Sequence, residues 1–495
     1  MGICYSSQPP QPNTVPTDEI IPLRFWDTAL CMTGTVLDIS LKYDDVLDIT
    51  KLRGALDKLF EREDWKQLGA RLRRNNGKLK YHIPATFNAS RPAYHFTSDC
   101  HDMSINDDPL GKRIPKAGDK PNLFCSPNEF SHLLCGPDSP RKLDDWISSD
   151  RPQLSIHTVS FNDATIITVT WIHTLADVMG IRTFLDAWTA TVRGDEDAVP
   201  KIQGFRADPL SELGQRTPAE KYIHYDRAFG RKDFLWFIAF NIFDRLWYRQ
   251  EERRTICLPA SSLRHLHSRA MTEISNVTPI DEKPTPFVSE SDVLLAWWIR
   301  TVNKALGFRA DKPILVINAL NLRTSSDEVL DSTNDVYMGN ALCMSPTMFQ
   351  GSQIGDESLG QIALRIRQSL AEQRSTEQIE AITALQMQTM EKTGYLALVG
   401  DPRMALLSCS NWHKARLYDV DFSSAVLPST QSKEEQLANP GKPSYVNGVQ
   451  HSANSFRNVL SVIGKDLSGN WWLTGVLRTG AWVQVQEQLD LLGMV

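Results

Sequence analysis

The residues best suited to chemistry in this sequence are His173 and Asp177, which follow a run with strong strand character. Residues 165–172 form a short run rich in β-branched side chains, as expected for a buried strand. After Gly180, apolar side chains recur on one face of a predicted helix: Ile181, Phe184, Leu185, Trp188 and Val192. His173 is therefore predicted to lie where a strand ends and a helix begins, a place from which a side chain can project into a cleft.

A histidine in such a place is suited to general base catalysis. Its imidazole has an ordinary pKa of about 6.5, so the neutral form can take a proton from an alcohol or an amine near pH 7. The nucleophile made in this way could attack an activated acyl group such as a thioester. Asp177, four residues later, could instead hold the turn together through a charge-assisted contact.

The His-x-x-x-Asp spacing is weak as an isolated pattern. Roughly one chance match is expected in a chain of this length with 11 histidines. His95-Phe-Thr-Ser-Asp99 has the same spacing, but it lies in a polar stretch. No β-branched run precedes it, and no glycine with an amphipathic helix follows it. The sequence context therefore favours His173.

The composition is that of a soluble globular protein too large for one ordinary core. The 495 residues are 41% hydrophobic and 23% charged, and 53 basic against 59 acidic residues give a formal net charge of −6. A nucleic-acid partner is not expected, because such proteins usually have a basic surplus. No metal site is predicted, since no zinc-binding Cys or Cys/His spacing occurs. With neither a secretory signal nor a bilayer-spanning apolar stretch, we expect a cytoplasmic monomer with reduced thiols.

The pattern along the chain predicts a few elements and connections. Residues 1–20 are expected to form a flexible tail. Helical spacing of apolar residues predicts an amphipathic helix over 48–62, and alternation predicts a strand over 70–84. The polar segment 193–222 contains several Gly and Pro residues, which is typical of a crossover or interdomain linker. A second polar segment, 428–447, is expected to be a long surface loop.

Residues 234–248 form an unusually apolar segment, in which twelve of the fifteen residues are apolar or aromatic. The segment is too short to span a bilayer. It suits either a buried helix or a helix that lies in a membrane interface. We favour a helix packed between domains and keep the interfacial helix as the alternative.

The segment Trp171-Ile-His173-Thr-Leu-Ala-Asp177-Val-Met-Gly180 resembles the His-x-x-x-Asp signature of the BAHD acyltransferases, which are CoA-dependent enzymes of specialised metabolism. The glycine displaced by two positions resembles the fungal branch of that family. Further segments are similar to family motifs in the same order, and the resemblance runs from about residue 21 to 490. They are Pro22-Leu-Arg-Phe-Trp-Asp27, Leu68-Gly-Ala-Arg-Leu72, Tyr81-His-Ile-Pro84, Phe287-Val-Ser289-Glu-Ser-Asp292, Asn318-Ala-Leu-Asn-Leu-Arg323, Tyr337-Met-Gly339-Asn340-Ala341 and Tyr418-Asp-Val-Asp421-Phe422.

The resemblance implies an α/β fold of two similar chloramphenicol-acetyltransferase-like domains with an active-site channel between them. Residues 21–215 would form the N-terminal acyltransferase domain, which carries the His-x-x-x-Asp motif, and residues 216–495 the C-terminal acyltransferase domain. Acyl-CoA would enter the channel from one side and a small-molecule acceptor from the other. The resemblance implies neither a metal nor a permanently bound cofactor.

The resemblance also implies roles for single residues. His173 would be the general base. Asp177 would face away from the substrate and support the site, with Arg323 as its salt-bridge partner by position. Asp421 would support the architecture far from the chemistry.

Two residues in the family motifs are candidates for contacts with CoA. They are Ser289 and Asn340. Ser289 is also suited to cap a helix, because Asp292 would stand at its third position. One segment departs from the family, since Ser423-Ser-Ala425 stands where the family has Gly-Trp-Gly.

These features predict a CoA-dependent acyltransferase that moves an acetyl group from acetyl-CoA to a hydroxyl of a hydrophobic specialised metabolite. N-acylation by the same base is the alternative within the family. A catalytically degenerate binding protein is the alternative from another class, and the departure at Ser423-Ser-Ala425 is what suggests it.

The first residues carry a separate signal. Met1-Gly2-Ile-Cys4-Tyr-Ser6 fits the pattern for N-myristoylation, and Cys4 could accept a second acyl chain. Two chains give stable membrane anchoring, whereas one gives only marginal binding. Residues 221–254 add eight basic and five acidic side chains around the aromatic segment. Peripheral membrane contact through an acylated N-terminus is therefore a hypothesis, and a simple polar tail is its alternative.

Overall fold

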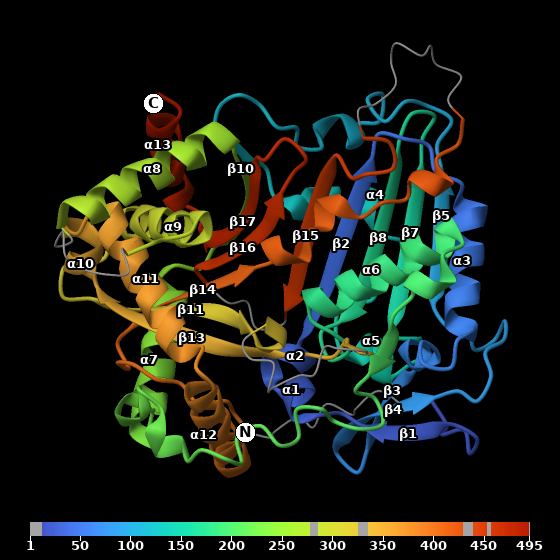
Figure 1. Cartoon of the computed structure of the whole chain (residues 1–495), viewed down its shortest axis with the longest axis horizontal. Helices are drawn as coiled ribbons and strands as arrows, with labels where there is room; N and C mark the ends of the chain where they lie inside the picture. Colours follow the sequence, from blue (N-terminus) through green and yellow to red (C-terminus); the bar gives the residue numbers. More distant parts are fainter. Residues whose placement is uncertain (1–11, 278–285, 325–334, 429–438, 453–456, 495) are drawn as a thin grey trace.

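A computed structural model describes residues 12–277, 286–324, 335–428, 439–452 and 457–494 (Figure 1). The N-terminal half is built around a five-stranded sheet with the order β15-β2-β8-β7-β5. Its strands are β15 (Tyr445–Ser452), β2 (Thr35–Tyr43), β8 (Thr165–Ile172), β7 (Leu154–Ser160) and β5 (His95–Cys100). Every residue of β2 and β8 is buried. The strand predicted over 165–172 is confirmed, and its β-branched side chains suit a strand packed on both faces.

The C-terminal half is built around a seven-stranded sheet with the order β13-β11-β14-β16-β17-β10-β6. Its strands are β13 (Leu342–Gln350), β11 (Pro313–Asn321), β14 (Ala405–Asn411), β16 (Val459–Lys465), β17 (Trp471–Arg478), β10 (Glu251–Leu258) and β6 (Asn122–Phe124). β11, β14 and β16 run parallel to one another, whereas the other neighbours are antiparallel. The fold is mixed α/β with two sheet-centred halves, as the resemblance implied.

Each sheet contains a strand from the other half of the sequence. β15 pairs antiparallel with β2 over eight residue pairs, from Tyr445 opposite Lys42 to Ser452 opposite Thr35. Figure 1 shows this orange-red strand beside the blue β2. β6, near residue 123, pairs in the same way with β10. The two halves are therefore joined by main-chain hydrogen bonds as well as by side-chain packing.

Two small sheets flank the large ones. β1 (Glu19–Pro22), β4 (Lys78–Ile83) and β3 (Arg71–Asn75) form the first in the order β1-β4-β3, and β12 (Asp335–Tyr337) pairs with β9 (Lys201–Gln203) in the second. The single strand predicted over 70–84 is wrong, because the chain reverses at Asn76 and Gly77. Both residues have positive φ, 52° and 77°, which is the geometry of a tight hairpin turn.

Helices cover both sheets. In the N-terminal half α3 and α6 pack on one another and on the core of the five-stranded sheet, and in the C-terminal half α8, α9, α11 and α13 share the core of the seven-stranded sheet. The helix predicted over 48–62 is confirmed as α3. The helices are α1 (Phe25–Thr28), α2 (Leu30–Thr33), α3 (Ile49–Glu61), α4 (Ser131–Leu134), α5 (Asp144–Ile147), α6 (Val178–Arg193), α7 (Arg231–Trp247), α8 (Ala260–Val277), α9 (Glu290–Leu306), α10 (Gly351–Asp356), α11 (Leu359–Gln373), α12 (Thr376–Thr393) and α13 (Ala481–Leu492).

Two predictions about connections are wrong. The polar segment 428–447 is not a surface loop to its end, because residues 445–447 start β15 and are buried. The apolar segment 234–248 lies in and directly after α7, of which no residue is buried. The preferred interpretation, a helix packed between domains, is therefore excluded. In the described ranges every cysteine is unbridged.

Candidate active site

His173 lies in the turn between β8 and α6, where the sequence placed it. Its backbone N–H donates to the carbonyl of Thr35 on β2 (2.9 Å), and the indole of Trp171 donates to the carbonyl of Ala176 (2.9 Å) and closes the turn. A Cβ atom on Gly180 would lie 1.9 Å from the carbonyl oxygen of Met338. The glycine at this position therefore allows the first turn of α6 to pack directly on the backbone that leads to Asn340.

Asn340 holds the His173 imidazole through its side-chain amide. The amide nitrogen donates to a carboxylate oxygen of Asp27 (2.7 Å) and to the carbonyl of His173 (2.8 Å). Because two acceptors fix the nitrogen, the amide oxygen faces His173 Nδ1 at 3.0 Å and must accept its proton. The Nε2 atom of His173 is then the unprotonated nitrogen, as a general base requires.

Asp27, which accepts from the Asn340 amide, lies in α1 near the N-terminal end of the sequence. Its carboxyl is buried and also accepts from the backbone N–H of Arg24 (3.3 Å). Burial raises the pKa of Asp27 to about 7, although the hydrogen bonds from Asn340 and Arg24 act in the opposite direction. Near neutral pH the carboxyl is therefore close to half ionised.

Burial also acts on His173 itself. It lowers the pKa of the imidazole below its ordinary value, and this effect exceeds the opposing effects of the backbone, Asp177 and Asn340. Removal from water disfavours the imidazolium form. The neutral base is therefore the dominant form at pH 7.

Asp177 and Arg323 form an ion pair next to the turn that carries His173. One carboxylate oxygen of Asp177 accepts from Gly180 N–H (2.9 Å) and caps α6, and the other accepts from Arg323 Nη1 (2.8 Å) and from Ala341 N–H (3.0 Å). Arg323 also donates to the carbonyls of Tyr337 (2.9 Å) and of the glycine two residues later. The ion pair thus ties the start of α6 to the backbone on both sides of Asn340.

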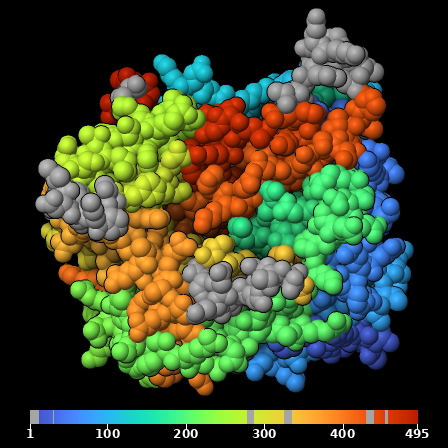
Figure 2. Space-filling view, viewed as in Figure 1, coloured from blue at the N-terminus to red at the C-terminus, as the bar shows by residue number. Residues whose placement is uncertain are grey.

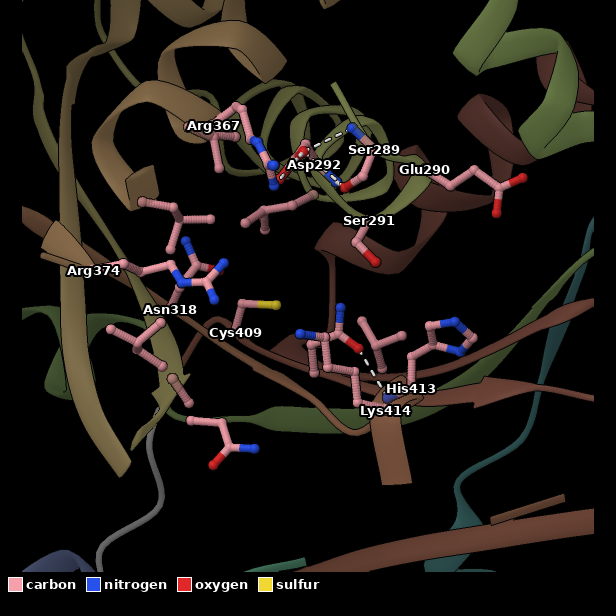
Figure 3. A pocket seen from close by; sticks show the side chains of 18 of the residues that line it. Ser289, Glu290, Ser291, Asp292, Asn318, Arg367, Arg374, Cys409, His413 and Lys414 are labelled. Carbon is pink, nitrogen blue, oxygen red and sulfur yellow. Dashed lines mark hydrogen bonds and ion pairs between the residues drawn. The ribbon is translucent and has the colours of Figure 1, made fainter. Parts of the chain in front are cut away.

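A cavity of about 640 Å³ lies in the C-terminal half and reaches the N-terminal half at Met179 (Figure 3). Met179, on the first turn of α6, contributes to its wall, and residues 318–321 at the end of β11 lead from it to Arg323. His173 is not among its lining residues. A second cavity, of about 630 Å³, shares Met179, His413 and Lys414 with the first, so the two are adjacent; together they are called the groove below.

Ser289 lies on the wall of this cavity as the N-cap of α9. Its hydroxyl accepts from Asp292 N–H (3.3 Å) and donates to the Asp292 carboxylate (2.7 Å), which in turn accepts from Ser289 N–H (2.8 Å). This is the reciprocal capping box that the sequence predicted. Both polar groups of Ser289 are therefore engaged with the helix (Figure 3).

The groove also contains cationic side chains. Arg367 lies 4.0 Å from Asp292, and Lys465 is paired with Glu290 (2.5 Å). The side chain of Arg374, directly after α11, donates to the carbonyl of Thr324 (3.1 Å). In the part of the chain that the structure describes, Arg374 and Lys414 form no ion pair with a carboxylate. They lie on different sides of the cavity in Figure 3.

Asp421 lies in a segment that packs on α3 and α6. Its carboxylate accepts from Ser423 N–H (2.8 Å), which starts a short 3₁₀ turn over 423–425. The neighbouring Phe422 ring contacts Trp188 at 4.9 Å between centroids. Trp188 is ten residues beyond the start of α6, about 15 Å along the helix. Ser423-Ser-Ala425, which differs from the family's Gly-Trp-Gly, therefore lies in a turn that packs on the N-terminal half.

Comparison with known proteins decides the family. The profile described as Transferase family matches residues 140–449, more than half of the chain. Acetyltransferase adrJ from Penicillium rubens is 67% identical over 495 residues, which cover 100% of both chains. The chain belongs to the Transferase family, the BAHD acyltransferases.

Another acetyltransferase relative and a solved structure agree with this assignment, whereas one relative carries a different name. O-acetyltransferase PaAT-2 from Phomopsis amygdali is 33% identical, with 97% of this chain and 99% of that protein covered. A relative from Sordaria araneosa, 36% identical over 99% of this chain and all of its own length, has the different name transcriptional regulator sdnM. The crystal structure of Fusarium graminearum TRI101 with ethyl coenzyme A has a TM-score of 0.65 at 15% identity, over 95% of this chain and 97% of that one. The protein is thus an acyltransferase with the BAHD fold.

Some site residues were missed at the sequence level. Asp27 stands in a segment quoted for its family resemblance, but no local pattern links it to Asn340, 313 residues later. Arg374 and Lys414 carry no motif, and only the fold brings them to one cavity. Their signal in the sequence is a positive charge next to a helix end or a strand end, which is too common to select them.

The N-terminal signal stays a prediction. Gly2 and Cys4 lie outside the described residues. Within the described ranges, no helix combines the length and the apolar character needed to cross a bilayer.

Proposed function

We propose that this BAHD acyltransferase transfers an acetyl group from acetyl-CoA to a hydroxyl of a small hydrophobic acceptor. The observation that supports this most directly is the His173 imidazole, whose Nδ1–H is bound by Asn340 and whose Nε2 is left to take a proton. A hydroxyl needs such a base, because it is not ionised near pH 7.

The proton that leaves the acceptor hydroxyl ends on the sulfur of CoA. Nε2 of His173 takes the hydroxyl proton while the acceptor oxygen attacks the thioester carbonyl carbon. The tetrahedral intermediate then breaks its carbon–sulfur bond, and the departing CoA sulfur takes the proton back from the imidazolium. The acetyl ester and free CoA leave, and the neutral base is regenerated.

CoA is proposed to lie in the groove between the two halves, 21–215 and 216–495. Its phosphates need cations, and Arg374 and Lys414 are cations in the groove that no carboxylate neutralises in the described ranges. The pantetheine arm would run past Met179 toward His173.

The site geometry supports a division of roles among the predicted residues. Asn340 has no exposed surface, and its side-chain amide is hydrogen-bonded to His173 and Asp27. We therefore propose that it positions the imidazole and does not contact CoA. Asp177 and Arg323 hold the Asn340 loop against α6. We propose that Ser289 caps α9 and has no direct role toward CoA. Asp421 would stabilise the N-terminal half only.

An acceptor screen tests this proposal. The purified protein is incubated with acetyl-CoA and a panel of hydrophobic alcohols, each matched with the amine of the same skeleton, and products are detected by mass spectrometry. Acetyl esters from alcohols, lost in His173→Ala, are expected. Products from amines alone would replace the proposal by N-acylation, the reaction in which the same base takes a proton from nitrogen.

A binding protein without turnover is the rival from another class. A relative named as a transcriptional regulator and the Ser423-Ser-Ala425 departure favour this rival. The complete His173, Asn340 and Asp27 arrangement favours catalysis instead. Binding of acetyl-CoA by calorimetry with no product from any acceptor and no thiol release would establish the rival.

The N-terminus supports a finer proposal about location, a peripheral attachment through acylation of Gly2 and Cys4. Cells that express the protein and its Gly2→Ala variant are fractionated. The wild-type protein is expected partly in the membrane fraction and the variant less so. Equal solubility of the two forms would contradict attachment through the N-terminus.

A further inference from the structure

The helix α7 has its apolar side turned outward. Counting 100° per residue, eight apolar side chains share the outer arc of the helix, and the one charged residue of α7 within this arc is Lys232 in the first turn. They are Leu235, Trp236, Ala239, Phe240, Ile242, Phe243, Leu246 and Trp247, and all are exposed. The exposed fractions of Leu235 and Trp247 are 67% and 72%. A surface helix in water normally has the opposite arrangement.

The inner side of α7 holds the helix in this orientation. The Phe237 ring contacts Phe229 at 5.7 Å between centroids, and Asp244 is paired with Arg457. Phe234 contacts Tyr395 at 5.5 Å. Phe234, Phe237 and Asp244 therefore hold α7 against the rest of the protein. The outward apolar face is therefore fixed by the fold.

The ends of the exposed face differ in character from its middle. Trp236 and Trp247 lie toward the two ends, with aliphatic and phenyl side chains between them. Lys232 and Arg249 lie beyond them in the sequence, and both are exposed. At the N-terminal end Asp233 caps the helix by accepting from Gly230 N–H (3.0 Å), and Arg231 and Lys232 beside it leave a basic surplus.

We propose that the outer face of α7 inserts into the interface of a membrane that contains anionic lipids. Tryptophan is favoured at the level of the headgroups, phenylalanine and leucine are favoured just below them, and basic side chains contact anionic headgroups. A single convex helix with bulky side chains along its ridge fits a deformable lipid layer. The basic ends give the charge complementarity that an anionic surface requires.

This contact is independent of N-terminal acylation and of the reaction. α7 lies at the lower left edge of the molecule in Figure 1, and none of its residues lines the groove proposed for CoA. The face is thus a second membrane determinant, built into the folded chain. It gives weak attachment to a protein that carries no lipid chain.

The test is co-sedimentation of the full chain with vesicles of phosphatidylcholine alone or mixed with phosphatidylserine. The protein carries Gly2→Ala, so that an acyl chain does not contribute. Binding is expected to the mixed vesicles, and it should weaken as salt is added. The triple variant Leu235→Ser, Phe243→Ser, Leu246→Ser should bind at least about tenfold more weakly, because three apolar side chains no longer enter the interface.

A matched control uses exposed apolar residues on another helix. Val483 and Leu491 on α13 are 65% and 55% exposed, and the double variant Val483→Ser, Leu491→Ser should bind as the parent does. Circular dichroism of all variants establishes that they fold. Equal binding by the triple variant, or no binding by the parent at low salt, would overturn the proposal. So would a parent that is dimeric by light scattering and becomes monomeric in the triple variant, since the occupant would then be a second copy.

Discussion

At the scale of single residues, the site is a chain of hydrogen bonds in which each proton position follows from its neighbour. Asp27 and the His173 carbonyl take both protons of the Asn340 amide, and the amide oxygen then takes the Nδ1 proton of His173. The base is thereby prepared before a substrate arrives. Asn340 lies 167 residues from His173 in sequence, so no spacing rule could have predicted this contact.

Asn340→Ala should lower kcat for acetyl transfer by about 100-fold while the KM for acetyl-CoA stays nearly constant. The imidazole loses the acceptor that fixes its tautomer, but the cationic groove is untouched. Asn75→Ala is the control, because Asn75 also contacts a histidine, outside the site: its amide nitrogen lies 3.1 Å from His82 Nε2. A rise in KM with unchanged kcat in Asn340→Ala would instead indicate a CoA contact.

Asp27 should make stability depend on pH in a known direction. Its folded pKa is about 7 and its ordinary value is 3.8, so between these values the folded state binds more protons than the unfolded chain. Its contribution to the free energy of unfolding is therefore greatest at low pH and is lost as the pH rises toward 7. From pH 5 to pH 8 the wild-type protein should lose about 3 kcal/mol relative to Asp27→Asn, measured by urea denaturation. A difference that does not change with pH would exclude a raised pKa.

At the scale of elements, the site depends on how closely α6 approaches the loop that carries Asn340. Local signals predicted the strand β8, the start of α6 and the capping box of α9, because caps and periodicity lie within a few residues of sequence. Two other signals were misleading. The run 70–84 contains a two-residue turn within one alternating pattern, and α7 has a core-like composition but an exposed face. Apolar content alone does not say what covers a helix.

Gly180→Ala should disrupt this approach, since the added Cβ would meet the Met338 carbonyl oxygen at 1.9 Å. We expect a loss of about 3 kcal/mol in the free energy of unfolding and a large fall in activity, because α6 must move away from the Asn340 loop. Gly54→Ala is the control on another helix. Nothing lies within 4 Å of its added Cβ, and alanine should stabilise α3 by about 1 kcal/mol. Equal stabilities of the two variants would contradict the packing described here.

At the scale of the whole molecule, the two halves exchange strands. The family resemblance predicted two similar α/β domains, and the observed sheets agree with that class. The exchange itself was not predictable from the sequence, because β15 and β6 each pair with a strand from the other half. Non-local pairing of this kind leaves no periodic signal. It also means that neither half has a complete sheet of its own.

A fragment that ends at residue 215 should therefore fail to fold, since it lacks β15 and exposes the buried strand β2 as an edge. The full chain should unfold in one transition that intrinsic fluorescence and circular dichroism report together. Two separate transitions, or a soluble fragment with native-like spectra, would show that the halves are independent.

The most direct test of the central claim is the release of free thiol from acetyl-CoA. Even without an acceptor, water should slowly replace the hydroxyl at a competent site. His173→Ala should release thiol about 100-fold or more slowly than the wild-type protein, while His95→Ala, which removes the histidine of the second His-x-x-x-Asp match, should behave as the wild type does. Equal rates in His173→Ala and the wild-type protein would show that His173 is not the general base.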